Sequence, residues 1–130
     1  MALEVEGYTL PVKKEDGSAL VYVVRPSFLG KLIRFNVFLD GKEIESEMGY
    51  TRGKQYIYFY VSPGTHQISS KAENWADITI DAKAGELIFI KQDVKMGLIM
   101  ARNQISQIDI VEGKYHVLNT ELGTIIKTRK

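Results

Sequence analysis

Two stretches decide the fold of this chain, VFLDGK at residues 37–42 and YVSPGTH at residues 60–66. In each, an apolar strand-like run leads into a turn dipeptide, Asp40-Gly41 in the first and Pro63-Gly64 in the second. Asp-Gly after a strand is typical of a two-residue hairpin because both residues tolerate a positive φ, and Pro-Gly suits the centre of a type II turn. The two stretches therefore predict antiparallel β-structure in which the chain reverses at each dipeptide.

Strand-like segments continue on both sides of these stretches. They cover residues 19–25, 33–40, 55–61, 66–72, 76–82, 87–90 and 105–110, and residues 87–90 are apolar on both parities, as expected of a central strand. Apolar residues then recur at intervals of four, three and four from Val111 to Leu122, which predicts a helix over that range. The sequence therefore predicts a mainly β protein, an antiparallel β-sandwich of seven or eight short strands with one short C-terminal helix.

A chain of 130 residues is long enough for one domain with its own core. Residues 1–18 show no sustained period and are interpreted as an N-terminal arm. Residues 19–122 form the predicted sandwich domain, and residues 123–130 form a basic C-terminal tail.

Composition excludes several classes of function. There is no cysteine, which removes disulfides, thiolate catalysis and cysteine-based zinc sites. Seventeen basic and sixteen acidic side chains give a net charge of +1, which argues against nucleic-acid binding. No apolar run approaches the ~20 residues of a transmembrane segment. The first residues do not resemble a signal peptide, so membrane anchoring is expected only if a lipidated leader is missing from this chain.

His66 is the most tempting single residue because histidine is a frequent general base and metal ligand. It follows Pro63-Gly64 and shares the side of Ile68, which favours a structural role in which it hydrogen-bonds a turn carbonyl. Ser62 lies near, yet no Gly-x-Ser-x-Gly elbow surrounds it. We therefore predict no catalytic residue, metal site or cofactor, and keep a small hydrolase or metal-dependent enzyme using His66 as the alternative.

Aromatic residues mark the candidate binding surface. Tyr56, Tyr58 and Tyr60 share one face of one strand, with Phe38 pointing outward on another. They form either a second core under the terminal helix or an exposed row that recognises carbohydrate or peptidoglycan. We expect the centre of the row to be covered and Tyr60 to stay accessible. Trp75 is placed in a loop, as a partner anchor or as a lid on the sandwich end.

The order of several motifs resembles a bacterial family of domains of unknown function, many of whose members are exported and lipid-anchored. The motifs are VYVVRP at 21–26, VFLDGK at 37–42, VSPGTH at 61–66, AGE at 84–86 and IVEG at 110–113. The middle third is also similar to PEGA-type surface modules, in which a strand ending in Asp-Gly is followed by one that leads into Pro-Gly-x-His. The resemblance implies a β-sandwich in the cell envelope with no assigned activity.

These observations favour a non-enzymatic binding or scaffold module that works through a protein partner or self-association. The enzyme alternative requires an acid, a base and a nucleophile that converge in a cleft. The carbohydrate alternative requires that the tyrosines be exposed together.

Overall fold

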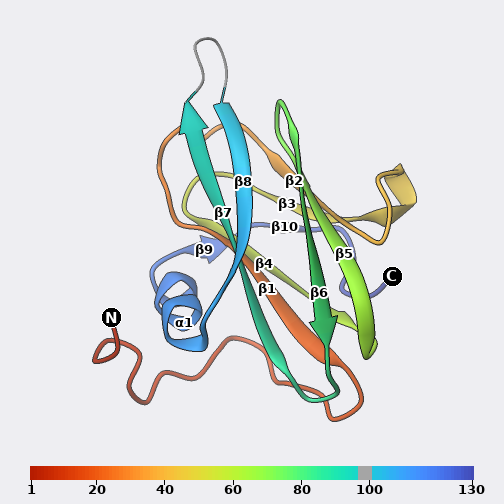
Figure 1. Cartoon of the computed structure of the whole chain (residues 1–130). Helices are drawn as coiled ribbons and strands as arrows, with labels where there is room; N and C mark the ends of the chain where they lie inside the picture. Colours follow the sequence, from red (N-terminus) through yellow and green to blue (C-terminus); the bar gives the residue numbers. More distant parts are fainter. Residues whose placement is uncertain (97–100) are drawn as a thin grey trace.

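The computed structural model describes residues 1–96 and 101–130, and most of its elements are strands (Figure 1). The strands are β1 (Ala19–Arg25), β2 (Phe35–Leu39), β3 (Glu47–Thr51), β4 (Gln55–Val61), β5 (Gly64–Lys71), β6 (Trp75–Ala82), β7 (Leu87–Met96), β8 (Ala101–Ile108), β9 (Glu121–Leu122) and β10 (Thr124–Ile125). One turn of 3-10 helix, η1 (Ile44–Ser46), precedes β3, and an α-helix, α1 (Ile110–Leu118), follows β8. The predicted mainly β architecture with one short helix is confirmed.

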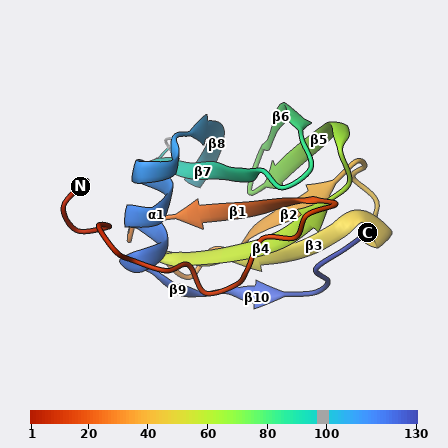
Figure 2. The same ribbon diagram turned by 90° about the horizontal axis from the view of Figure 1, so that it is seen from below.

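The strands form two five-stranded sheets, which lie as two layers (Figure 2). The first sheet has the order β8-β7-β1-β4-β9, and the second has the order β10-β3-β2-β5-β6. Strand β1 lies at the centre of the first sheet, and all of its residues are buried, as its β-branched run favours. Most pairings are antiparallel, but β1 pairs with β7, and β4 with β9, in parallel.

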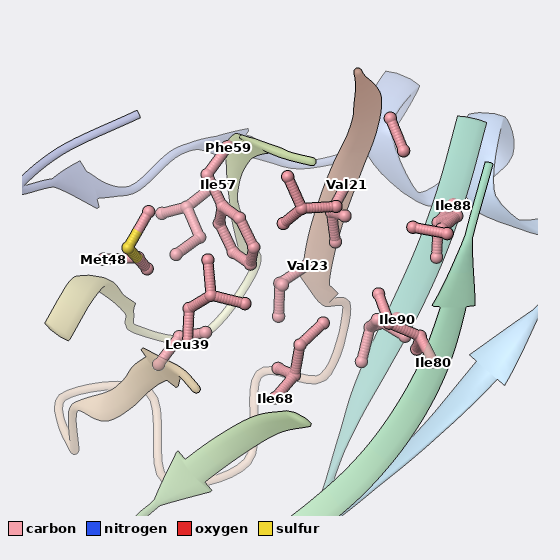
Figure 3. Packing of buried hydrophobic residues seen from close by; sticks show 14 residues of the cluster. Val21, Val23, Leu39, Met48, Ile57, Phe59, Ile68, Ile80, Ile88 and Ile90 are labelled. Carbon is pink, nitrogen blue, oxygen red and sulfur yellow. The ribbon is translucent and has the colours of Figure 1, made fainter. Parts of the chain in front are cut away.

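The main core fills the space between the two sheets (Figure 3). The first sheet contributes Val21, Val23, Ile57, Phe59, Ile88 and Ile90, and the second contributes Val37, Leu39, Met48, Ile68 and Ile80. A buried polar bridge also joins the layers, because Gln92 Nε2 donates to Ser70 Oγ at 3.0 Å and Thr51 Oγ1 donates to Gln92 Oε1 at 2.6 Å. These polar groups satisfy one another, so their burial does not leave an orphaned donor or acceptor.

A second hydrophobic cluster lies on the outer face of the first sheet. Its buried members are Leu20, Tyr22, Val24, Tyr56, Phe89 and Val117, and Leu10 and Val12 of the N-terminal arm pack against them. Asp109 caps the N-terminus of helix α1, because its carboxylate accepts a hydrogen bond from Glu112 N at 2.8 Å. No helix in the described residues is long and apolar enough to cross a bilayer.

The two turn dipeptides do not form the tight reversals that the sequence predicts. Asp40, with φ of 55°, begins the connection 40–46, which contains η1 before β3 pairs with β2. Pro63-Gly64 carries the chain from β4 in the first sheet to β5 in the second, and these strands are not neighbours. Alternation of apolar and polar residues identifies a strand, but it does not identify the strand with which it pairs. A turn dipeptide occurs equally well where the chain crosses from one sheet to the other and where it forms a hairpin.

Three further details differ from the predictions. Helix α1 ends at Leu118, and Leu122 lies in β9. Ile33, expected on the core face of a strand, precedes β2 and is exposed. Phe38, expected to point outward, is buried against Trp75, with ring centroids 5.1 Å apart. Phe38 does point away from the main core, as the alternation along the strand predicts. It is nevertheless buried, because Trp75 covers the outer face of the sheet at this position.

Residues 121–130 run along the side of the sandwich and contact both sheets. Strand β9 pairs with β4 of the first sheet, and β10 pairs with β3 of the second. Farther on, Tyr60 N donates to Thr128 O at 2.8 Å. The segment interpreted as a basic tail thus places its last residues at the sandwich end where β2 and β4 terminate.

Candidate functional site

A hollow of about 460 Å³ lies at that end of the sandwich. It is lined by Asp40 after the end of β2, by Ser62 from the crossing between β4 and β5, by His66 near the start of β5, and by Arg129 and Lys130. The structure therefore brings the Asp40-Gly41 and Pro63-Gly64 stretches to one place. An acid, an imidazole and a serine hydroxyl meet there, which is the grouping that a hydrolase would need.

Asp40 and His66 form the central contact of the hollow. His66 Nδ1 lies 2.6 Å from Asp40 Oδ2, and the His66 side chain is only 12% exposed. Asp40 also fixes the backbone of β5, since its Oδ1 accepts from Gln67 N at 2.8 Å and its own N donates to Gln67 O at 2.8 Å. The carboxylate thus ties the end of β2 to β5.

The second ring nitrogen of His66 faces Ser62. Nε2 lies 2.7 Å from the carbonyl oxygen of Ser62 and 3.4 Å from its hydroxyl oxygen. A carbonyl oxygen only accepts hydrogen bonds, so Nε2 must carry a hydrogen at this distance. Nδ1 donates to the Asp40 carboxylate in the same way. Both ring nitrogens are therefore donors, and the ring is an imidazolium. We call Asp40, His66 and the Ser62 carbonyl the histidine clasp.

The electrostatics of the clasp favour the protonated ring. Burial of the ring lowers the pKa of His66, but the hydrogen bond that His66 donates to Asp40, the bond it donates to the Ser62 carbonyl and the charge of Asp40 outweigh burial. The pKa of His66 is therefore raised above its ordinary value of 6.5. A general base needs a free lone pair, and the clasped ring offers none.

The two cations of the hollow are also engaged within the protein. Lys130 Nζ donates to Leu39 O at 2.9 Å, to Asp40 O at 3.0 Å and to Ser46 Oγ at 2.8 Å. Arg129 pairs with Glu15 of the N-terminal arm, and its guanidinium lies 4.6 Å from the Tyr60 ring centroid. The hollow is thus a set of mutually satisfied polar groups where both sheets, the end of the N-terminal arm and the last residues of the chain meet.

The tyrosine row is mostly covered. Tyr56 is 8% exposed and belongs to the second cluster, whereas Tyr58 and Tyr60 are half-buried at its margin. Tyr60 Oη donates to Lys13 O at 2.8 Å, so the N-terminal arm lies against this residue. The most buried member is therefore at one end of the row and not at its centre.

Trp75 begins β6 and does not lie in a loop. It packs edge-on against Phe38, and Lys42 Nζ and Lys71 Nζ lie 4.9 Å and 5.3 Å from its ring centroid. Trp75 is therefore half-buried beneath two cations, apart from both the tyrosine row and the hollow. Within residues 1–96 and 101–130, no three His, Asp or Glu side chains gather as a metal site would require.

Sequence reasoning singled out Asp40 and His66 as turn residues but did not pair them. They are 26 positions apart, and their contact depends on β2 lying beside β5. Arg129 and Lys130 were missed as members of the hollow for the same reason. The sequence does place an acidic residue and a histidine at the ends of two predicted strands. These two residues can be recognised as a contact only when β2 is known to pair with β5.

The clasp predicts a pH-dependent stability for the variant His66→Ala. Because the pKa of His66 is raised in the folded protein, its stabilising contribution is complete below pH 6.5 and is lost as the pH rises through the folded-state pKa. Just below pH 6.5 we expect the variant to lose about 1.5 kcal/mol relative to the wild type, the lower end of the range for hydrogen bonds to a charged group. Urea unfolding at several pH values measures this difference, and Ser62→Ala, which keeps the carbonyl, should unfold like the wild type. A difference that grows with pH would contradict the clasp.

Comparison with known proteins gives a family without an assigned activity. Residues 15–105 match the model of a family described as protein of unknown function (DUF2846). An uncharacterized protein of Haemophilus influenzae is 30% identical over 101 residues, which cover 77% of this chain and 58% of the relative. The chain thus aligns with less than two thirds of that relative's length.

Proposed function

This chain belongs to the DUF2846 family of unknown function. From the geometry of its hollow and from the resemblance of its motifs, we propose that it is a non-enzymatic binding or scaffold module of a bacterial cell envelope. One observation carries the non-enzymatic part of the proposal. The histidine in the acid–imidazole–serine grouping donates from both ring nitrogens and leaves no base to activate the serine.

The way in which the hollow is built supports a scaffold role. Its carboxylates, cations and backbone carbonyls bind one another and join β2, β5, the N-terminal arm and residues 129–130. Such a network fixes the end of the sandwich and leaves few polar groups free to hold a substrate. A rigid two-sheet module of this kind suits a spacer or a platform within a larger assembly.

The envelope location rests on kinship. The chain's motifs resemble those of exported, lipid-anchored proteins of unknown function, and its middle third is similar to PEGA-type surface modules. Fractionation of bacteria that produce the natural protein should recover it with the envelope. Recovery in the cytosolic fraction would contradict this part of the proposal.

A serine hydrolase is the second candidate, because Ser62 Oγ lies only 3.4 Å from His66 Nε2. A fluorophosphonate probe, which labels activated serines, separates the two functions. We expect no labelling of the wild type at a pH above the ordinary value for histidine, and the same result for Ser62→Ala. Labelling of the wild type that disappears in Ser62→Ala would overturn the non-enzymatic proposal. Carbohydrate binding by the tyrosine row has weaker support, since Tyr56 is buried.

A further inference from the structure

The connection between β1 and β2, residues 26–34, exposes an unusual amount of apolar surface. Phe28, Leu29, Leu32 and Ile33 are 58%, 47%, 76% and 42% exposed, respectively. The connection leaves the end of β1 and arches over to β2 (Figure 1, orange). It lies at the end of β1 and β4 opposite the hollow, because Arg25 pairs with Gln55 and Ala19 with Val61. We call residues 26–34 the apolar loop. Clustered exposed apolar residues of this kind mark docking surfaces.

The apolar loop is fixed in place by the protein. The buried guanidinium of Arg25 donates to Gly30 O at 2.8 Å and also to Ile33 O, so it holds the loop backbone from within. From the other side, Gly53 N donates to Lys31 O at 2.9 Å and Lys54 N donates to Ser27 O at 3.3 Å. The apolar side chains are thus held outward by a defined backbone.

Close packing at Gly53 supports the same conclusion. A Cβ atom at this position would lie 2.7 Å from Lys31 Cβ and 3.1 Å from Ser27 O. Only a residue without a side chain permits the turn between β3 and β4 to approach the loop so closely. Two independent features, a buried arginine and a glycine, thus serve to hold an exposed apolar loop in one conformation.

Four cations lie in the apolar loop or beside it. Lys31 Nζ and Lys54 Nζ lie 5.4 Å and 5.2 Å from the Phe28 ring centroid, and the guanidinium groups of Arg34 and Arg52 lie 4.3 Å and 5.6 Å from that of Tyr50. None of the four forms an ion pair within the described part of the chain. The chain as a whole is nearly neutral, so this concentration of unpaired positive charge is local.

We propose that the apolar loop docks onto the surface of an anionic lipid bilayer, with Phe28, Leu29, Leu32 and Ile33 entering the headgroup region and the four cations contacting acidic headgroups. Peripheral binding of this kind grows with the apolar area inserted and with the attraction to anionic lipid. An apolar protein groove would match the four side chains, but it would leave the four cations without a function. The charge complementarity therefore favours lipid over a protein partner.

Flotation with vesicles tests the proposal. The wild type should float with vesicles of phosphatidylcholine and phosphatidylglycerol, float much less with phosphatidylcholine alone, and lose binding as salt screens the cations. The double variant Phe28→Ser/Leu32→Ser should lose most of the binding. Lys31→Gln/Lys54→Gln should bind about 25-fold more weakly, at roughly five-fold for each cation removed. The control is Ile44→Ser, because Ile44 is equally exposed but lies on η1.

Several results would contradict lipid binding by the apolar loop. All of these side chains are exposed, so unchanged melting temperatures will show that the variants fold. The proposal is wrong if the wild type does not bind anionic vesicles, or if Phe28→Ser/Leu32→Ser binds them as well as Ile44→Ser does. It is also wrong if the double variant abolishes a dimer seen by sedimentation while no form binds vesicles, since the loop would then be a protein interface. These results leave the proposal for the hollow untouched, because that site lies at the other end of the sandwich.

Discussion

Replacement of Arg25 by alanine should destabilise the protein by about 3 kcal/mol or more, the largest loss expected for a charged residue in this chain. The guanidinium is fully buried, lies 3.8 Å from the Phe35 ring centroid and donates to Thr51 O at 3.1 Å in addition to the loop carbonyls. Alanine would remove the guanidinium donors from these carbonyls and open a cavity beside the core. The cost of desolvation is already visible, since burial lowers the pKa of Arg25 to about 10.

Two further variants separate the effect of the lost hydrogen-bond donors from the effect of the cavity. Arg25→Met restores much of the volume but none of the donors, so it should recover only part of the stability and should leave the apolar loop loose. Arg34→Ala removes an exposed arginine of the same region and should change stability by less than about 0.5 kcal/mol. Urea unfolding measures all three variants. Equal stability of Arg25→Ala and Arg34→Ala would contradict the structural role of Arg25.

Gly113→Ala should also destabilise the protein, by about 2 kcal/mol, although alanine is the better helix former by roughly 1 kcal/mol. A Cβ atom at position 113 would lie 2.1 Å from Phe89 Cγ. Phe89 cannot yield easily, because it is buried and stacks on Tyr22 with ring centroids 5.5 Å apart. Helix α1 would have to move away from β7, which would expose part of the second cluster.

The opposite signs of these two effects make the variant informative. Helix propensity alone predicts stabilisation, whereas close packing against Phe89 predicts destabilisation. Gly17→Ala provides a matched control, since a Cβ atom there would have no neighbour within 4 Å. Thermal unfolding of the two variants compares them directly. A melting temperature of Gly113→Ala at or above that of the wild type would show that α1 does not pack on β7 as described.

Strand positions and the terminal helix could be predicted from the sequence because period-two and helical patterns are local. Pairing could not be predicted, which is why Asp40-Gly41 and Pro63-Gly64 were interpreted as tight turns. Arg25 follows a β-branched run, and no local pattern indicates that a cation at this position is buried under loop carbonyls. That burial depends on the course of residues 26–34, which only the tertiary structure reveals.

The candidate site was likewise predicted only in its local features and not in its long-range contacts. The apolar and aromatic content of the tyrosine row was visible in the sequence, but its cover depends on the N-terminal arm and α1, which are distant along the chain. The histidine clasp joins residues from three strand ends. The predicted bond from His66 to a turn carbonyl is present, at Ser62, but the contact with Asp40 was not predicted. Without that contact, the protonation state of His66 could not be inferred, and neither could the choice between a base and a structural cation.

The most direct test of the clasp is a pH titration of the His66 ring nitrogens by nitrogen-15 NMR, with the resonances assigned by comparison with His116→Gln. At pH 6.5 we expect His66 to be more than half imidazolium, with hydrogen on both ring nitrogens, because its pKa is raised. Asp40→Asn should lower the midpoint, since it removes the charge that favours the imidazolium. A midpoint at or below 6.5, with an unprotonated Nε2 next to Ser62 at neutral pH, would contradict the clasp and restore His66 as a free base.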